Sequence, residues 1–242
     1  MTPKTPLFGH RIDSKILVLF LGLSVATFAL LWLASEVLEG DVFWIDRVIM
    51  RGLRSAPYAS VLIGPQWLAS AVIDVTALGG VTVLTFITVF AIGFLIAIRK
   101  HSTALFVALA VSSGALLSSG LKGLFVRPRP DIVPHLVQVS SSSFPSGHAM
   151  NSALVYLTLA TLVARSQQDS RVRVYLLTVA IILTLAIGST RVFLGVHWPS
   201  DVAAGWSVGA AWAVLCSLAG KALQRRRKIE ESGSLAGSRN SD

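Results

Sequence analysis

Several uninterrupted apolar runs in the sequence are long enough to cross a lipid bilayer, and they limit the fold more than any other feature. A helix needs about 20 predominantly apolar residues to span the hydrocarbon core. Because water is absent there, each backbone N–H and C=O must be bonded internally, which runs of this length achieve as α-helices. We therefore predict an all-α, polytopic membrane helix bundle with six transmembrane helices, at residues 16–34, 80–98, 103–121, 148–163, 174–189 and 202–218.

The apolar runs divide the chain into three parts. Residues 1–15 are polar and are expected to form a cytoplasmic N-terminus, and residues 16–222 form one membrane-embedded domain. Residues 223–242 begin with basic residues and then turn to Glu, Ser, Gly and Asn, which is typical of a disordered cytoplasmic tail. The run at 16–34 is long for a signal-peptide core, and no small-x-small cleavage site follows it, so we expect an uncleaved helix.

Residues 35–79 mix acidic and apolar side chains between the first two runs. Asp46 lies among Trp44, Val48 and Ile49, and this spacing is typical of an amphipathic helix in the membrane interface. Trp67 also suits an interfacial position. The predicted fold includes this interfacial amphipathic helix. A loop packed across the mouth of the bundle would explain the composition equally well, and the sequence leaves the two open.

The chain carries a formal net charge of +9. Nucleic acid does not explain the excess, because the cations are scattered between apolar runs that leave little water-exposed surface. Cytoplasmic segments of membrane proteins are rich in Lys and Arg, and a cytoplasmic N-terminus places 14 of the 21 basic residues inside. We expect a multi-pass protein of the cell (inner) membrane. The other cations face the periplasm or exterior: Arg47, Arg51, Arg54, Lys122, Arg127, Arg129 and Arg191.

Three polar clusters stand at the ends of apolar runs, and the expected topology puts all three on the outer side. Ionisable groups at membrane depth are costly and usually functional. Each cluster alone has a structural explanation, such as a snorkelling lysine or a helix cap, but their convergence on one face favours a shared site. The clusters read Lys122…Arg129-Pro130, then Pro145-Ser146-Gly147-His148, then Thr190-Arg191…His197…Asp201.

The residue types in these clusters predict a pocket for an anion. Lys122, Arg129 and Arg191 offer charge-assisted donors, and arginine matches phosphate oxygens with two parallel bonds. Ser146 and Gly147 stand where a helix begins, so backbone N–H groups there can point at an oxyanion.

Two histidines, which titrate near neutrality, accompany the predicted pocket. His197 and Asp201 are four residues apart, and Pro199 between them suits the first turn of a helix. A carboxylate in that turn can reach back to one imidazole nitrogen and leave the other free to attack. This is the arrangement used in nucleophilic catalysis.

The three motifs resemble the signature of the type 2 phosphatidic acid phosphatase superfamily, the lipid phosphate phosphatases. The family pattern is K-x6-R-P, then P-S-G-H, then S-R-x5-H-x3-D, and every spacing is matched within about residues 120–201. One position departs from it, because Thr190 stands where the family usually has Ser, although a hydroxyl is kept. The six-span layout also resembles the family's, so residues 16–222 are expected to form a phosphatase domain.

The resemblance implies a role for each matched residue. His197 is the expected nucleophile that forms a phosphohistidine, Asp201 orients it, and His148 protonates the leaving group and then activates water. The expected phosphate ligands are Lys122, Arg129, Ser146, Gly147 and Arg191. No cofactor is expected, and no metal, because the surrounding cations would repel an ion from His148, His197 and Asp201. The expected partner is a lipid phosphate in the bilayer: undecaprenyl pyrophosphate, phosphatidylglycerol phosphate or phosphatidic acid.

Three other functions share some of these features. A lipid phosphotransferase would use the same phosphohistidine with a lipid acceptor, and the sequence leaves this alternative open. Vanadate-dependent haloperoxidases share the pocket but are soluble proteins. A transporter should carry ionisable residues at mid-span or paired broken helices, whereas here they cluster at span ends and no repeat is evident.

A few polar and small residues stay without an assigned role. Asp74 fits a helix cap or a substrate contact, His135 lies in the outer loop, and Arg127 adds to the positive field of its motif. Gly205 and Gly209 form a G-x-x-x-G pattern, which favours close helix packing and leaves a homodimer interface open.

Overall fold

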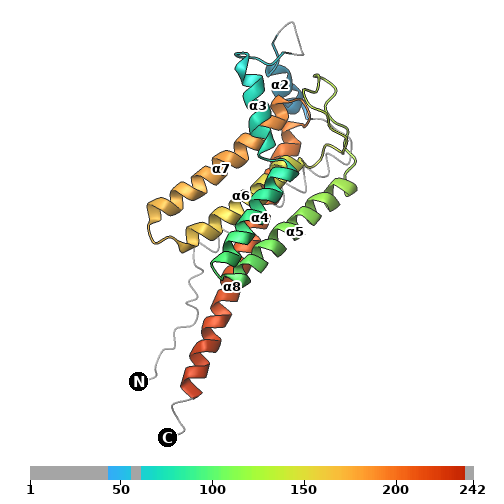
Figure 1. The fold of residues 1–242 in the computed structure, drawn as a ribbon. Helices are drawn as coiled ribbons and strands as arrows, with labels where there is room; N and C mark the ends of the chain where they lie inside the picture. The colour runs from blue at the N-terminus through green and yellow to red at the C-terminus, as the bar shows by residue number, and fades with distance from the viewer. Residues whose placement is uncertain (1–42, 56–60, 238–242) are drawn as a thin grey trace, which may run out of the picture.

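The computed structural model describes residues 43–55 and 61–237, with side chains up to Leu223. This part of the chain is helical, and its only extended pairing is an isolated antiparallel bridge between Arg54 and Leu62. The helices are α2 (Trp44–Gly52), α3 (Trp67–Ala77), α4 (Val81–Ala97), α5 (His101–Leu124), α6 (Gly147–Ser166), α7 (Ser170–Phe193) and α8 (Pro199–Gly237). The all-α prediction is therefore confirmed for the described residues (Figure 1).

Four of the described helices are long and apolar enough to cross a membrane: α5, α6, α7 and the part of α8 up to Leu223. A fifth candidate is the pair α3 and α4, which meets the same test only when taken together and bends by 47° at its break. The predicted first span, 16–34, lies outside the described residues. The structure thus supports a multi-pass membrane bundle with four or five described spans, and the count of six stays a prediction.

Helices α5 to α8 extend beyond their predicted bounds, whereas α4 (Val81–Ala97) is one residue shorter at each end than the predicted span 80–98. Helix α7 was predicted at 174–189 and extends from Ser170 to Phe193, and α5 and α6 are also longer than their apolar runs. Polar residues at the ends of these runs continue the helix beyond the hydrocarbon. Helix α8 likewise continues to Gly237, into the segment that we expected to be a disordered tail.

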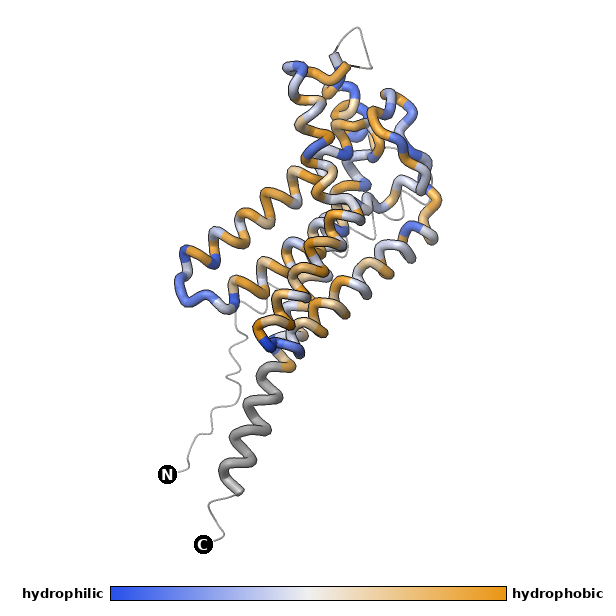
Figure 2. Tube along the Cα trace, viewed as in Figure 1, coloured by the Kyte–Doolittle hydropathy of each residue, from blue (hydrophilic) through white to orange (hydrophobic). Residues whose placement is uncertain are grey.

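Helix α6 lies at the centre of the bundle and packs against α4, α5, α7 and α8, most extensively against α7 and α8 (Figure 1). Apolar colour covers the middle of the long helices, and hydrophilic colour gathers in the connections at both ends (Figure 2). Many large apolar side chains point outward, as a lipid-facing surface requires. They include Phe86, Phe90, Phe94, Leu105, Leu109, Leu116, Val174 and Ile182.

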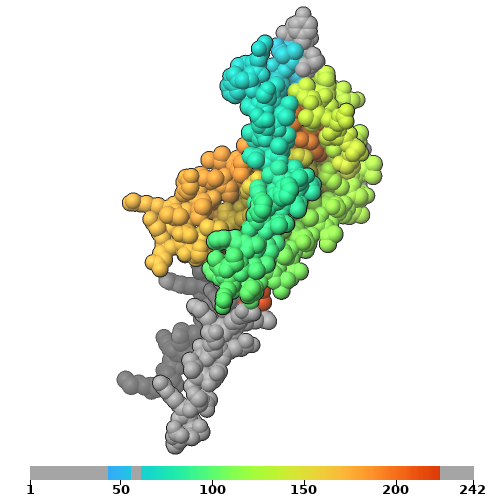
Figure 3. Space-filling view, in the orientation of Figure 1, coloured from blue at the N-terminus to red at the C-terminus, as the bar shows by residue number. Residues whose placement is uncertain are grey.

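Within the segment 35–79, the structure describes two helices, α2 and α3. Helix α2 is amphipathic as predicted, with Trp44 and Val48 exposed and Asp46 and Met50 buried against the bundle. Helix α3 was not predicted as a separate element. It stacks above α4 in one continuous column on the face shown in Figure 3. The break between the two lies at Gly79 and Gly80.

The G-x-x-x-G pattern of α8 serves packing inside the chain. A methyl group at Gly205 would lie 2.7 Å from the backbone oxygen of Ser146, and one at Gly209 would lie 2.7 Å from Cβ of Ala153. Both contacts are with α6, and small residues allow two helix backbones to approach this closely. The prediction of close helix packing is confirmed, and this glycine face is not available to a second copy of the chain.

Replacing Gly209 with alanine should therefore destabilise the bundle. The added methyl overlaps Ala153 and the Met150 backbone, and overpacking of this kind costs about 1–3 kcal/mol. Gly93→Ala on α4 is the matched control, because nothing lies within 4 Å of a methyl there and alanine favours a helix. Thermal unfolding in detergent should show a lower Tm for Gly209→Ala alone. Equal Tm values for the two variants would contradict the packing.

Candidate active site

The three sequence motifs come together where four helix ends meet. Lys122 stands in the last turn of α5, His148 in the first turn of α6, Arg191 in the last turn of α7, and Asp201 in the first turn of α8. A backbone hydrogen bond joins two of the motifs, because the N–H of Ser146 donates to the carbonyl of Asp201 at 3.0 Å. The three motifs therefore converge at one end of the helix bundle, and the side of the membrane on which they lie stays a prediction.

The side chains of His197 and Asp201 lie beside each other in the protein interior. His197 is 2% exposed and Asp201 is fully buried. Nδ1 of His197 lies 3.5 Å from Oδ2 of Asp201, as the four-residue spacing predicted, and also 3.5 Å from Oγ of Ser143. The Ser143 hydroxyl donates to Asp201, so both oxygens can accept a proton from Nδ1. These distances are long for hydrogen bonds, which in empty active sites often tighten once substrate binds.

The other ring nitrogen of His197 faces the cations. Its Nε2 lies 3.4 Å from Nη1 of Arg129, which also donates to the carbonyl of Val196 at 2.6 Å. A guanidinium can only donate, so this neighbour favours the tautomer with the proton on Nδ1 and a lone pair on Nε2. Burial lowers the pKa of His197 to about 4, although Asp201 opposes that effect, so the ring is neutral at pH 7.

Lys122 and Arg129 are held by one segment of the connection between α5 and α6. Nζ of Lys122 donates to the hydroxyl of Ser141 at 3.2 Å and to the carbonyl of Ser142 at 3.3 Å. Arg129 donates from Nε to the carbonyl of Ser141 at 2.8 Å. A methyl at Gly147 would lie 3.1 Å from Cε of Lys122, so a glycine there lets the lysine reach the start of α6.

Arg191 is fixed by a residue that the sequence did not single out. Its Nη1 donates to the hydroxyl of Thr76 on α3 at 2.9 Å, and the side chain is buried. Thr190 beside it donates to the carbonyl of Ile187 in its own helix. Two buried polar atoms near these motifs have no hydrogen-bond partner, Nε of Arg191 and Oγ of Ser146. Such atoms are costly unless they are satisfied, and phosphate oxygens can accept from both.

His148 lies half-buried at the start of α6 and packs against the break between α3 and α4. A methyl at Gly79 would lie 3.2 Å from the His148 ring. The ring lies within electrostatic reach of Arg191, His197 and Lys122. All eight residues predicted from the motifs are therefore gathered around one site, with His148 and His197 coming from different helix ends.

Arg127 has a more specific position than the general field that the sequence indicated. It is buried, and its Nη1 donates to Oδ1 of Asp201 at 2.5 Å and to the hydroxyl of Ser200 at 2.8 Å. Its Nη2 lies 3.5 Å from the carboxylate of Asp46 on α2. The guanidinium also lies 5.8 Å from the ring centroid of Trp198. Arg127 thus bridges two carboxylates behind the candidate nucleophile.

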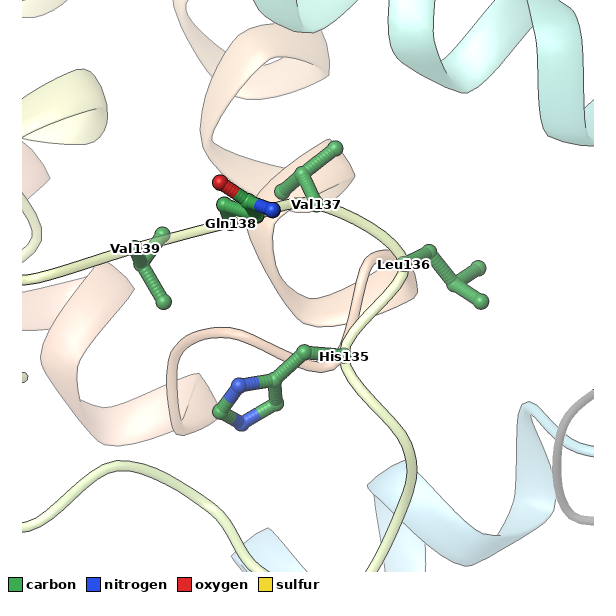
Figure 4. Close-up of a pocket in the computed structure, with 5 residues that line it drawn as sticks. All are labelled: His135, Leu136, Val137, Gln138 and Val139. Atoms are coloured by element: carbon green, nitrogen blue, oxygen red, sulfur yellow. The ribbon is translucent and has the colours of Figure 1, made fainter.

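The two residues whose roles were left open lie apart from these contacts. Nε2 of His135 is 2.7 Å from the carbonyl of Pro130, and the residue lines an open pocket of about 460 Å³ with residues 136–139. Leu136 points away from the imidazole in that pocket (Figure 4). Asp74 is exposed on α3. Asp74 lies inside α3, whose capping residues are Gln66 and Leu78, so the cap reading is wrong, and the substrate contact stays untested.

Metal ligation was judged unfavourable from the sequence. Within residues 43–55 and 61–223, no group of three or more His, Cys, Asp or Glu side chains is arranged to hold a metal ion. Among the residues that the structure describes, the only acid that contacts either histidine is Asp201, which accepts hydrogen bonds from Arg127 and Ser143. Metal independence stays a prediction that needs an activity measurement.

Several residues of the site carry no local sequence signal. Ser143 precedes the second motif in a run of serines, and nothing in the spacing marks it as a partner of Asp201. Thr76 and Asp46 are separated from their partners by 115 and 154 residues. Only the mixed composition of residues 35–79, with an acidic residue among apolar ones, indicated that this segment contacts the bundle.

Comparisons with known proteins find phosphatases among the relatives of this chain. The PAP2 superfamily model matches residues 102–225. Phosphatidylglycerophosphatase B of Bacillus subtilis (strain 168) is 37% identical over 152 residues, which cover 62% of this chain and 74% of the relative. Decaprenylphosphoryl-5-phosphoribose phosphatase of Mycobacterium tuberculosis (strain ATCC 25618 / H37Rv) is 32% identical over 127 residues, which cover 50% of this chain and 65% of the relative.

A solved structure is similar over most of the chain. The crystal structure of a transmembrane PAP2-type phosphatidylglycerolphosphate phosphatase from Bacillus subtilis has a TM-score of 0.70 and 28% sequence identity. The match covers 81% of this chain and 96% of that one. The likeness therefore includes nearly the whole fold of the relative.

Proposed function

The chain belongs to the PAP2 superfamily and is a membrane phosphatase, and on that premise we propose that it hydrolyses a lipid phosphate or pyrophosphate through a phosphohistidine at His197. The observation that carries the proposal is the setting of one imidazole. Nδ1 of His197 faces Asp201, and Nε2 faces Arg129 among the phosphate-binding cations. A neutral ring held this way presents its lone pair to a phosphorus atom bound by those cations.

The first step transfers the phosphoryl group to the enzyme. Lys122, Arg129 and Arg191 bind the phosphoryl oxygens and balance the charge that spreads over them, which is the main catalytic requirement of phosphoryl transfer. The new bond joins His197 Nε2 to phosphorus as the bond to the leaving oxygen breaks. His148 gives its proton to that oxygen, and Asp201 stabilises the positive charge that the His197 ring acquires.

The second step returns the enzyme to its starting state. His148, now neutral, takes a proton from a water molecule that attacks the phosphorus. The bond between phosphorus and His197 Nε2 breaks, and inorganic phosphate leaves. One residue serves as acid and then as base, which is the ordinary pattern when both half-reactions pass through the same geometry. A lipid hydroxyl in place of water would give the phosphotransferase reaction.

An apolar groove supports a substrate with a lipid tail. A space of about 400 Å³ lies between α4, α5 and α6, lined by residues such as Leu84, Ala115 and Leu154. Asn151 lines it one helical turn after His148, and Ser119 lines it one turn before Lys122. A headgroup bound by the cations could therefore continue into a tail in this groove. The named relatives act on a glycerophospholipid phosphate and on a polyprenyl-linked sugar phosphate.

We therefore propose undecaprenyl pyrophosphate, phosphatidylglycerol phosphate and phosphatidic acid as candidate substrates. Each presents a terminal phosphate that fits among three cations and a tail that stays in the bilayer. The pocket is built from span ends, so a headgroup at the membrane–water boundary lies at the right depth. The observations do not favour one tail over another.

Substitution of the two histidines should separate their roles. His197→Ala should lose essentially all turnover, because no nucleophile remains. His148→Ala should lose about 10²–10⁴-fold in kcat, the usual value of a general acid–base. Phosphate release from a lipid phosphate in detergent, in excess EDTA and without added acceptor, measures both. Near-normal turnover by His197→Ala, or activity that EDTA abolishes and magnesium restores, would contradict the mechanism.

Filling the groove should harm lipid substrates selectively. Ala115→Phe places a ring in the groove and should lower kcat/KM for a lipid phosphate by about tenfold, since even one methylene in an apolar pocket is worth that much. Leu116→Phe is the control, because Leu116 is 73% exposed on the same helix. Activity on a soluble phosphate ester should be unchanged in both. A soluble ester that the wild type prefers would contradict the lipid substrate and leave the phosphatase intact.

The site is proposed to face the periplasm or exterior, with the opposite ends of the helices in the cytoplasm. His101 begins α5 at one end, and His135 lies in the connection at the other end, and both are exposed. In a Cys216→Ala background, His101→Cys should react with an impermeant thiol reagent only from the inside. His135→Cys should react only from the outside. Reaction of both from the same side would overturn the topology.

A further inference from the structure

The buried side of α2 carries an acid whose partners lead to the candidate nucleophile. Asp46 is 1% exposed and lies 154 residues from its principal partner. Its Oδ1 accepts from the N–H of Ser200 at 2.9 Å, and its Oδ2 accepts from the Ser200 hydroxyl at 2.5 Å. The guanidinium of Arg127 lies 3.5 Å from the same Oδ2. Each of these partners is a donor, as an ionised carboxylate requires.

Arg127 connects this acid to the carboxylate that orients His197. Its Nη1 donates to Asp201 at 2.5 Å, and both side chains of that pair are buried. The contacts therefore run in sequence from Asp46 through Arg127 and Asp201 to the neutral ring of His197. Burial raises the pKa of Asp46, and the donors from Ser200 and Arg127 oppose that effect. In this cluster the guanidinium of Arg127 contacts the carboxylates of both Asp46 and Asp201.

The charge balance of the cluster has a consequence for catalysis. Two carboxylates and one guanidinium leave a net negative charge behind His197, in a setting where charges are poorly screened. If Asp46 were neutral, the positive charge of Arg127 would offset the negative charge of Asp201, and these three side chains together would carry no net charge. His197 gains a positive charge when its Nε2 bonds to phosphorus, so the surplus negative charge stabilises that state.

We propose that Asp46, on the amphipathic helix α2, is a positioning residue that acts through Arg127 to keep the charge of Asp201 available to His197. The proposal rests on His197 being the nucleophile, as proposed above. Asp46 itself touches neither substrate nor the reacting nitrogen. Arg127 transmits its effect because the same guanidinium contacts both acids.

The test removes one negative or one positive charge from the cluster and compares the pH dependence of the variants. Asp46→Asn removes one negative charge and should lower kcat by about tenfold, within the range for residues coupled in one ion-pair network, with little change in KM. The acid limb in the pH profile of kcat/KM should move to lower pH, because the removed negative charge no longer stabilises protonated His197. Arg127→Gln should move that limb to higher pH. The double variant Asp46→Asn/Arg127→Gln restores the net charge and should return the limb toward its wild-type position.

Other charged groups also face His197, but none of them is changed in these variants. These groups are Asp201 from α8, Arg191 from α7, His148 from α6 and Arg129 from the connection before α6. The titration of the substrate is the same in every variant as well. A difference in the pH of the acid limb between variants therefore reports the charge of the cluster. Ser200→Ala is the matched control, because it removes the hydroxyl between Asp46 and Arg127 without changing a charge. Its acid limb should stay at the wild-type pH.

Each result supports or contradicts the relay, by which we mean the action of Asp46 on His197 through Arg127 and Asp201. Opposite shifts in the two single variants and recovery in the double variant would support it. If Arg127→Gln fails to fold, the difference between Asp46→Asn and the double variant decides. Lower Tm values with an unmoved acid limb would show that Asp46 only anchors α2, and would overturn the proposal. An inactive wild type, or an active His197→Ala, would instead overturn the proposed function on which the relay rests.

Discussion

The buried carboxylate of Asp201 is the interaction that holds the three motifs of the site together. Its Oδ2 accepts from Ser143 and from the backbone N–H of Trp198, and its Oδ1 accepts from Arg127. Its backbone carbonyl accepts from Ser146 at the start of α6. A buried charge is stable only when it is paired and hydrogen-bonded. The fold meets that requirement with donors from the α5–α6 and α7–α8 connections, and this arrangement places His197 beside the carboxylate.

The membrane explains why the site is built from helix ends. Inside hydrocarbon, charged side chains are costly, whereas at a helix end they reach water and the headgroup region. The four long helices bring their ends together on one side because α6 packs closely against α7 and α8. Helices α2 and α3 cover that end and add Asp46 and Thr76. Exposed apolar side chains on α2 and α3, including Trp44 and Trp67, suit the same membrane boundary.

The sequence predicted the parts of the structure that have local signals. Apolar runs of bilayer length predicted α4 to α8, and motif spacing predicted the eight candidate residues that the structure brings together. It did not identify α3 or the break at Gly79, because a short helix between glycines has no bilayer-length run. Nor did it identify the partners of Asp201 and Arg191. Ser143 meets Asp201, Thr76 meets Arg191 and Asp46 meets Ser200 only through tertiary contacts. No local pattern records a contact across 58, 115 or 154 residues.

The central claim is that the phosphoryl group passes through Nε2 of His197, and trapping that intermediate tests it most directly. The enzyme would be mixed with a lipid phosphate, quenched within milliseconds under alkaline conditions and digested, and the phosphorylated peptide located by mass spectrometry. The account predicts one phosphopeptide, modified at His197 and absent from His197→Ala. It also predicts that His148→Ala accumulates more of it when the leaving group needs no protonation. Phosphate on His148 or on a serine, or none at all during rapid turnover, would contradict the account.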